Sequence, residues 1–137
     1  MLAIRRYKTN HSKLFVTLLF CLIATSAHAE KKIMIFGDSN HDVYLGCLNC
    51  SEVAADSVHN ELGKYGSDLS STSIFNNLGK YGSVLSQYSP CNVLASNPPV
   101  AVDEDGEFYG YLTLNELKPK AITDTNTISW LKYKVCK

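Results

Sequence analysis

The chain has 137 residues, with thirteen lysines and arginines, thirteen aspartates and glutamates, and five cysteines. All the acidic residues lie at or after Glu30, whereas four of the basic residues lie before it, so residues 30–137 carry a net charge of −4 and contain no arginine. Proteins that bind nucleic acid or anionic lipid usually gather arginine and lysine on one face, so this composition argues against both partners.

The first 29 residues have the three parts of a secretory signal peptide. Basic residues without any acid precede an apolar run of eleven residues, Leu14–Ala24. That run is too short to span a bilayer, which takes about 20 apolar residues. Ala27 and Ala29 then supply the small residues of a cleavage site before Glu30. We therefore expect residues 1–29 to be removed, leaving residues 30–137 as a single exported domain, periplasmic or secreted, with no membrane span.

Lys32–Phe36 is predicted to be a buried strand that ends at Gly37. The following Gly37-Asp38-Ser39-Asn40 resembles the first block of the GDSL/SGNH hydrolases, and Asp56-Ser57-Val58-His59 has the D-x-x-H form of that family. In the family, however, the D-x-x-H lies near the C-terminus, and the doubly wound fold needs a longer chain. A strand-ending turn is the preferred interpretation. A small serine esterase that uses Ser39 with His59 is the least favoured functional alternative.

Val43–Leu48 is the second candidate strand, and it leads into the first of four cysteines that follow the expected cleavage site. An even number of cysteines in a small exported domain indicates two disulfides. Three pairings are possible, and we favour the one that would tie the middle of the chain to its C-terminus. That pairing joins Cys47 to Cys50 and Cys91 to Cys136.

Cys47-Leu48-Asn49-Cys50 is also a C-x-x-C motif, which allows two chemically active interpretations. A thiol-active protein would place the first cysteine at a helix N-terminus, where its pKa falls. A zinc site would need further ligands, for which His41 and His59 lie at plausible distances. No second C-x-x-C and no H-x-x-x-H is present. We therefore expect a structural disulfide, with neither metal nor cofactor, and keep thiol activity as the alternative.

A sixteen-residue repeat organises the middle of the chain. Residues 57–72 and 73–88 share the hexapeptide Leu-Gly-Lys-Tyr-Gly-Ser, and residues 89–99 form a degenerate third copy. Each unit is predicted to be one helical turn capped by its first serine, then a glycine corner and a short extended piece. The leucine is expected to be buried. The glycines, at 63, 66, 79 and 82, are expected to adopt the left-handed conformation.

Tyr65 and Tyr81 occupy the same position in the two complete units. Presented on matching loops, they are candidate contacts for a ligand such as a glycan or a peptide. The alternative, which we favour, is that both rings pack against their neighbours, because regular repeats more often encode packing than recognition.

The C-terminal third predicts a hairpin and a short helix. Two β-rich arms, Pro99–Val102 and Phe108–Leu114, flank an acidic turn at residues 103–107. That turn lacks the ligand spacing of a calcium loop, so turn chemistry explains it better. Capping residues at 124–127 then predict a short terminal helix. The whole chain is therefore expected to be α+β, with a small antiparallel sheet, short helices and Gly-rich repeat loops.

The chain resembles a group of small exported bacterial proteins that carry no assigned function. The resemblance covers about residues 32–116 and depends on a combination of four motifs: Val43–Cys50, the repeats, Asn97-Pro98-Pro99-Val100 and Phe108-Tyr109-Gly110-Tyr111. Members often have tryptophan where this chain has His59, Phe75 and Cys91. The resemblance implies a bacterial, exported protein and supplies no catalytic residues. We expect a non-catalytic module that binds or supports an unidentified partner at the envelope or outside the cell.

Overall fold

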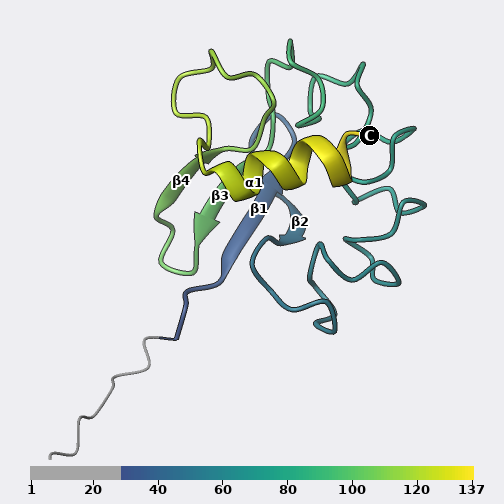
Figure 1. The fold of residues 1–137 in the computed structure, drawn as a ribbon, viewed down its shortest axis with the longest axis vertical. Coiled ribbons are helices and arrows are strands. Elements are labelled where there is room, and N and C mark those ends of the chain that lie inside the picture. The colour runs from purple at the N-terminus through teal and green to yellow at the C-terminus, as the bar shows by residue number, and fades with distance from the viewer. Residues whose placement is uncertain (1–28) are drawn as a thin grey trace, which may run out of the picture.

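The computed structural model describes residues 29–137, so nearly all of the expected signal peptide lies outside the described residues. Four strands form one antiparallel sheet in the order β2-β1-β3-β4, and a short helical segment follows them (Figure 1). The elements are β1 (Ile33–Gly37), β2 (Val43–Cys47), β3 (Val100–Asp103), β4 (Phe108–Tyr111), α1 (Thr125–Trp130) and η1 (Leu131–Val135), the last with π-helical hydrogen bonds. A small antiparallel sheet with a short helix is thus confirmed. No helix in this part of the chain is long and apolar enough to cross a bilayer.

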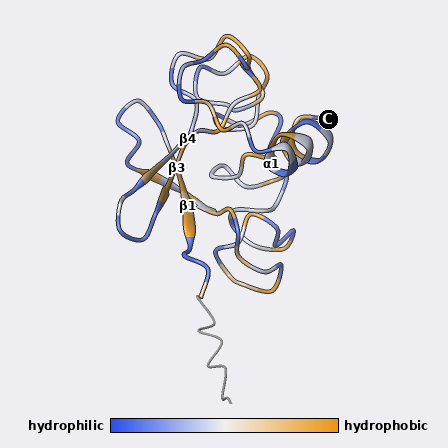
Figure 2. Ribbon diagram, turned by 60° about the vertical axis from the view of Figure 1, so that its left-hand side comes forward, coloured by the Kyte–Doolittle hydropathy of each residue, from blue (hydrophilic) through white to orange (hydrophobic). Residues whose placement is uncertain are grey.

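The core lies between the sheet, the segment that joins β2 to β3, and the terminal helical segment. Ile35 pairs with Ala101, and Ala101 pairs with Gly110, so these residues share one face of the sheet, and all three are buried. Strand β1 appears as a hydrophobic segment in Figure 2. The buried cluster combines residues from β1, β2, the series of turns, the segment after β4 and η1: Ile35, Leu45, Val58, Ile74, Tyr81, Cys91, Leu112, Leu131 and Val135.

Residues 51–95 form a continuous series of tight turns. The carbonyl oxygen of each corner residue accepts a hydrogen bond from the amide of the next corner, three or four residues further on. In the first complete unit the corners are Ser57, Asn60, Gly63, Ser67 and Ser70, and the second unit repeats them sixteen residues later. The predicted alternation of a helical turn with an extended piece is therefore wrong. Serine and asparagine at the corners explain the difference, because their side chains stabilise isolated turns.

The first serine of each unit caps a turn from a buried position. Ser57, Ser73 and Ser89 are fully buried, and each Oγ accepts a hydrogen bond from the amide two residues ahead, at 3.0–3.1 Å. Since a buried amide without a partner is costly, these hydroxyls make the tight turns possible inside the core. Capping by the serines was predicted, but it supports a turn rather than a helix.

The asparagine corners hold neighbouring turns together. Asn76 Oδ1 accepts a hydrogen bond from the amide of Leu78, and its Nδ2 donates to the carbonyl oxygen of Ser70. Asn60 makes the equivalent pair of bonds one unit earlier. Leu78 therefore lies at the tip of a turn and is 93% exposed, whereas Ile74 is buried. The prediction that the leucine of each unit is buried is wrong for this reason.

The repeat glycines serve close packing rather than left-handed backbone. The glycines with positive φ are Gly46, Gly106 and Gly110, all outside the repeats. A Cβ atom on Gly82 would lie 2.2 Å from the carbonyl oxygen of Asn76, and the same distance separates the Cβ position of Gly66 from the Asn60 oxygen. The expected left-handed glycines are therefore a wrong prediction. Only glycine lets the backbone of one turn approach the previous turn this closely.

The terminal helical segment contacts the same position in all three repeat units. The ring of Trp130 lies 5.3 Å from that of His59 and 5.9 Å from that of Phe75, between ring centroids. In the third unit the matching residue is Cys91, which forms a disulfide with Cys136. Residues 59, 75 and 91 are sixteen residues apart. The helical segment therefore lies along the series of turns and joins its successive units.

The acidic turn between β3 and β4 is organised by Asp103. This buried carboxylate accepts hydrogen bonds from the amides of Asp105 and Glu107 at 2.9 and 2.8 Å, and Lys31 contacts it at 3.3 Å. Bonding to the Glu107 amide holds the pKa of Asp103 below its usual value. Within residues 29–137 no group of three His, Cys, Asp or Glu side chains is placed to hold a metal ion. The predicted hairpin is confirmed, and the acids support its turn.

Candidate functional site

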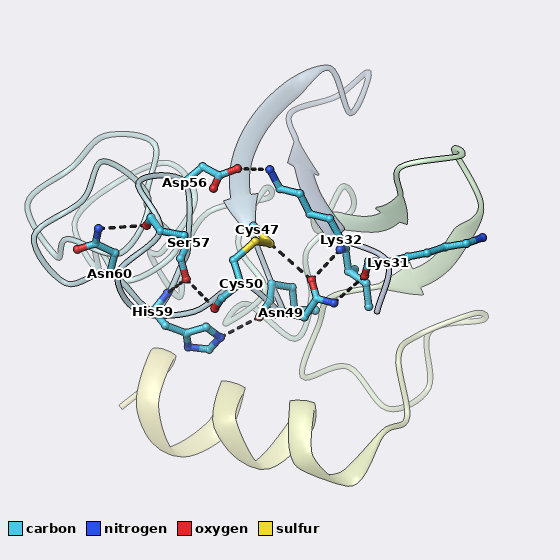
Figure 3. The surroundings of a disulfide bond; sticks show 12 residues. Lys31, Lys32, Cys47, Asn49, Cys50, Asp56, Ser57, His59 and Asn60 are labelled. Atoms are coloured by element: carbon cyan, nitrogen blue, oxygen red, sulfur yellow. Dashed lines mark hydrogen bonds and ion pairs between the residues drawn. A yellow bond between two sulfur atoms is a disulfide. The ribbon is translucent and has the colours of Figure 1, made fainter. Parts of the chain in front are cut away.

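The loop that follows β2 is fixed by a disulfide and by backbone bonds. Cys47 and Cys50 form the predicted short disulfide, with their Cα atoms 5.5 Å apart. The amide of Cys47 donates to Asp56, and the amide of Val58 donates back to Cys47. Ser57 Oγ also donates to the carbonyl oxygen of Cys50 at 3.0 Å. The loop between Cys47 and Val58 is therefore tied to the end of β2 at several points (Figure 3).

Asn49, inside this loop, holds the beginning of β1. Its Oδ1 accepts a hydrogen bond from the amide of Ile33 at 2.8 Å, and its Nδ2 donates to the carbonyl oxygen of Lys31 at 2.7 Å. Leu48 adds a backbone bond to Ile33. The C-x-x-C loop thus positions Asn49 so that its side chain bonds to the backbone at the start of β1, as a neighbouring strand would. Sequence reasoning missed this role, because Asn49 and its partners are sixteen or more residues apart.

His59 extends from this loop toward the terminal helix (Figure 3). Its Nε2 lies 2.8 Å from the carbonyl oxygen of Leu48, so this nitrogen carries the proton and donates. The ring packs against Trp130. The hydrogen bond and the aromatic contact together fix the histidine in place as one wall of a groove.

The groove lies between the sheet, the disulfide loop and α1, and its volume is about 690 Å³. Its apolar surface comes from Ile33, Ala101 and Ile122, and two larger aromatic rings line it, Trp130 and Tyr109. The remaining lining residues are Glu30, Leu48, Asn49, His59, Ala121, Thr123, Asp124, Asn126 and Thr127. A concave surface that combines apolar and aromatic side chains with polar groups is typical of a ligand site.

Asp124 marks the edge of the groove where α1 begins. Its Oδ2 accepts hydrogen bonds from the amide and the hydroxyl of Thr127, both at 2.8 Å. These bonds lower the pKa of Asp124, because they favour the ionised carboxylate. The groove therefore carries a fixed negative charge at one end.

The residues of the hypothetical serine esterase do not meet. His59 bonds to Leu48, which in turn pairs with Ile33 at the first residue of β1, whereas Ser39 lies two residues beyond the last residue of β1. Four residue steps of a strand separate these ends by about 13 Å. Asp56 is engaged by Lys32 and by the Tyr44 hydroxyl instead. The geometry therefore gives no support to a triad of Ser39, His59 and Asp56.

The C-x-x-C motif lacks the surroundings of a redox centre. Cys47 is fully buried, and the residues that follow Cys50 form turns rather than a helix. The helix dipole that lowers a catalytic thiol pKa is thus missing beside this pair. His41 is the other histidine considered as a zinc ligand, and its Nε2 lies 3.0 Å from the carbonyl oxygen of Pro98.

Tyr65 and Tyr81 lie against the sheet. Tyr81 is only 5% exposed and its hydroxyl donates to Asp38 at 3.2 Å, while the half-buried ring of Tyr65 packs 5.1 Å from that of Tyr44. Lys80 and the amide of Ser39 lower the pKa of Asp38 to about 2, so Tyr81 bonds to a charged partner. Neither tyrosine lines the groove. Their packing is the alternative that the sequence favoured, and ligand contact by either ring stays a prediction.

Comparison of the chain with protein-family models, with curated proteins and with solved structures found no match. The resemblance to small exported bacterial proteins therefore stays a prediction.

Proposed function

We propose that residues 30–137 form an exported, non-catalytic binding module of the bacterial envelope, and that the groove beside Trp130 holds its ligand. The observation that carries this proposal is the combination of a concave apolar surface with exposed aromatic area. Tyr109 is 48% exposed although it lines the groove, so its ring is available to a ligand. Aromatic rings supply large contact area at low entropic cost, which is why binding sites favour them.

The rigidity of the groove supports the same function. Its walls are fixed by the Cys47–Cys50 disulfide, by Asn49 and by the contact of Trp130 with His59. A wall that is already ordered loses little entropy when a ligand binds. The two disulfides are compatible with an oxidising space outside the cytoplasm.

Export is tested by the intact mass of the protein recovered from its cell envelope or medium after thiol alkylation. We expect a chain that begins at Glu30 and four cysteines that resist alkylation, because both pairs are joined. A chain that retains residues 1–29 would contradict export with cleavage. Alkylation of Cys47 and Cys50 in the native protein would instead support the thiol-active alternative.

Binding in the groove is tested through Trp130, which is the only tryptophan of the chain. We expect a saturable change of its fluorescence when short peptides or cell-wall glycan fragments are titrated. Tyr109→Ala is expected to weaken binding about tenfold, since truncation of a central aromatic contact costs about 1–2 kcal/mol. Tyr133→Ala is the matched control, because Tyr133 is exposed and lies outside the groove.

Two results would contradict the groove as the binding site. One is a ligand that binds with unchanged affinity to the Tyr109→Ala variant. The other is a panel in which no probe alters Trp130 emission at millimolar concentration.

A further inference from the structure

The charges around the groove have one sign. Its lining includes two carboxylates, Glu30 and Asp124, and neither lysine nor arginine. Lys31, next to Glu30, runs toward the β3–β4 hairpin (Figure 3) and pairs with Asp103 and Asp105 at 3.3 and 2.8 Å. Lys31 is therefore engaged elsewhere, and none of the ion pairs among residues 29–137 involves Glu30 or Asp124.

The aromatic rings favour a cation as well. The faces of tryptophan and tyrosine attract ammonium and guanidinium groups through the negative potential above the ring, and tryptophan does so most strongly. Trp130 and Tyr109 line the groove together with both carboxylates. Glu30 and Asp124 are both exposed, so a ligand reaches them without entering the core.

The apolar surface matches the aliphatic part of a basic side chain. Lysine and arginine pack their methylene groups on apolar surface while their charged ends stay with polar partners. Ile33, Ala101 and Ile122 supply such a surface. The volume of about 690 Å³ lies within the range of about 300–1,000 Å³ that holds compact ligands, so the groove fits a few residues of extended chain.

We infer that the groove binds an extended basic segment of a partner protein, with a lysine or arginine side chain between the carboxylates and the rings of Trp130 and Tyr109. This inference rests on the proposed function of the groove as a binding site. The inference adds that the ligand is a basic protein segment, and the reason is charge complementarity with the groove.

The first experiment compares three capped hexapeptides in which alanine alternates with lysine, glutamine or glutamate. Each is titrated into the full exported domain while Trp130 fluorescence is measured. We expect the lysine peptide to bind about tenfold more tightly than the glutamine peptide, and the glutamate peptide to bind least. The preference is expected to shrink between about 0.02 and 0.5 M salt, because rim charges are screened over about 10 Å at 0.1 M.

The second experiment removes the charges while keeping the structure. Asp124→Asn preserves the helix cap, since asparagine caps as well as aspartate. Combined with Glu30→Gln, it is expected to weaken lysine-peptide binding about tenfold and glutamine-peptide binding much less. Asp68→Asn, which removes a carboxylate at an exposed residue outside the groove, is the control and is expected to change neither affinity.

The outcomes separate this inference from the proposed function. Equal binding of the lysine and glutamine peptides would overturn the inference and leave the groove as a binding site. A change of lysine-peptide affinity in Asp68→Asn as large as in the double variant would also overturn it. Binding of spermine with the affinity of the lysine peptide would overturn the assignment to a protein segment. Failure of every peptide and of the glycan fragments would contradict both the inference and the proposed function.

Discussion

Replacement of Cys91 and Cys136 by alanine is expected to lower the free energy of unfolding by about 4 kcal/mol. The disulfide between them closes a loop with a sequence separation of 45, and in the chain-entropy model a loop of that size contributes about this amount. A domain of this size has a free energy of unfolding of about 5–15 kcal/mol, so the variant loses a large part of it. Urea unfolding of the two proteins, followed by far-UV circular dichroism, measures the difference.

The matched control is the double alanine variant of Cys47 and Cys50. That disulfide has a sequence separation of only 3, so its chain-entropy contribution is about 2 kcal/mol. We expect amide exchange in α1 and η1 to accelerate only when the Cys91–Cys136 bond is lost. Equal effects of the two double variants would contradict the role assigned to the long-range disulfide.

Gly82→Ala is expected to destabilise the protein by about 3 kcal/mol. The added methyl group would lie 2.2 Å from the carbonyl oxygen of Asn76 and 2.7 Å from that of Ile74. Both obstacles are backbone atoms within a hydrogen-bonded series of turns, so relief requires the turns to separate. Gly66→Ala meets the equivalent atoms one unit earlier and is expected to have a similar effect.

Gly79→Ala provides the comparison within the same unit. Its nearest neighbours would be side-chain atoms of Asn76 at 3.0 Å rather than backbone atoms at 2.2 Å, so a displacement of a few tenths of an ångström relieves the contact. We expect a change within about 1 kcal/mol, measured by the same unfolding experiment. A Gly79→Ala effect as large as that of Gly82→Ala would show that backbone overlap is not the reason why glycine occupies position 82.

Local patterns were sufficient to predict the sheet and the disulfides. The apolar run before Gly37 and the β-rich arms around residues 103–107 each predicted a strand, and all lie in one sheet. The preferred cysteine pairing is also the one observed. These predictions succeeded because each depends on short-range patterning or on a small number of possible arrangements.

The repeat and the groove show where sequence reasoning failed. Apolar and glycine residues in each unit suggested a buried leucine and left-handed corners, but the backbone follows the hydrogen bonds of Ser73 and Asn76 instead. The groove escaped detection because its residues come from separate segments and share no motif. Trp130 and Tyr109 line one groove only after the sheet and the terminal helix are both in place. Such a site depends on tertiary structure, which a single sequence does not display.

The Cys91–Cys136 bond determines how the domain responds to pulling between β1 and the residue after Cys136. A force applied to Glu30 and Lys137 passes through the Cys91–Cys136 bond directly into the third repeat unit. Residues 92–135, which include β3, β4, α1 and η1, lie inside the closed loop and carry no tension along their backbone. Stretching would therefore extend only residues 30–91, and reduction of this one bond would roughly add the length of 44 more residues, about 150 Å of extended chain.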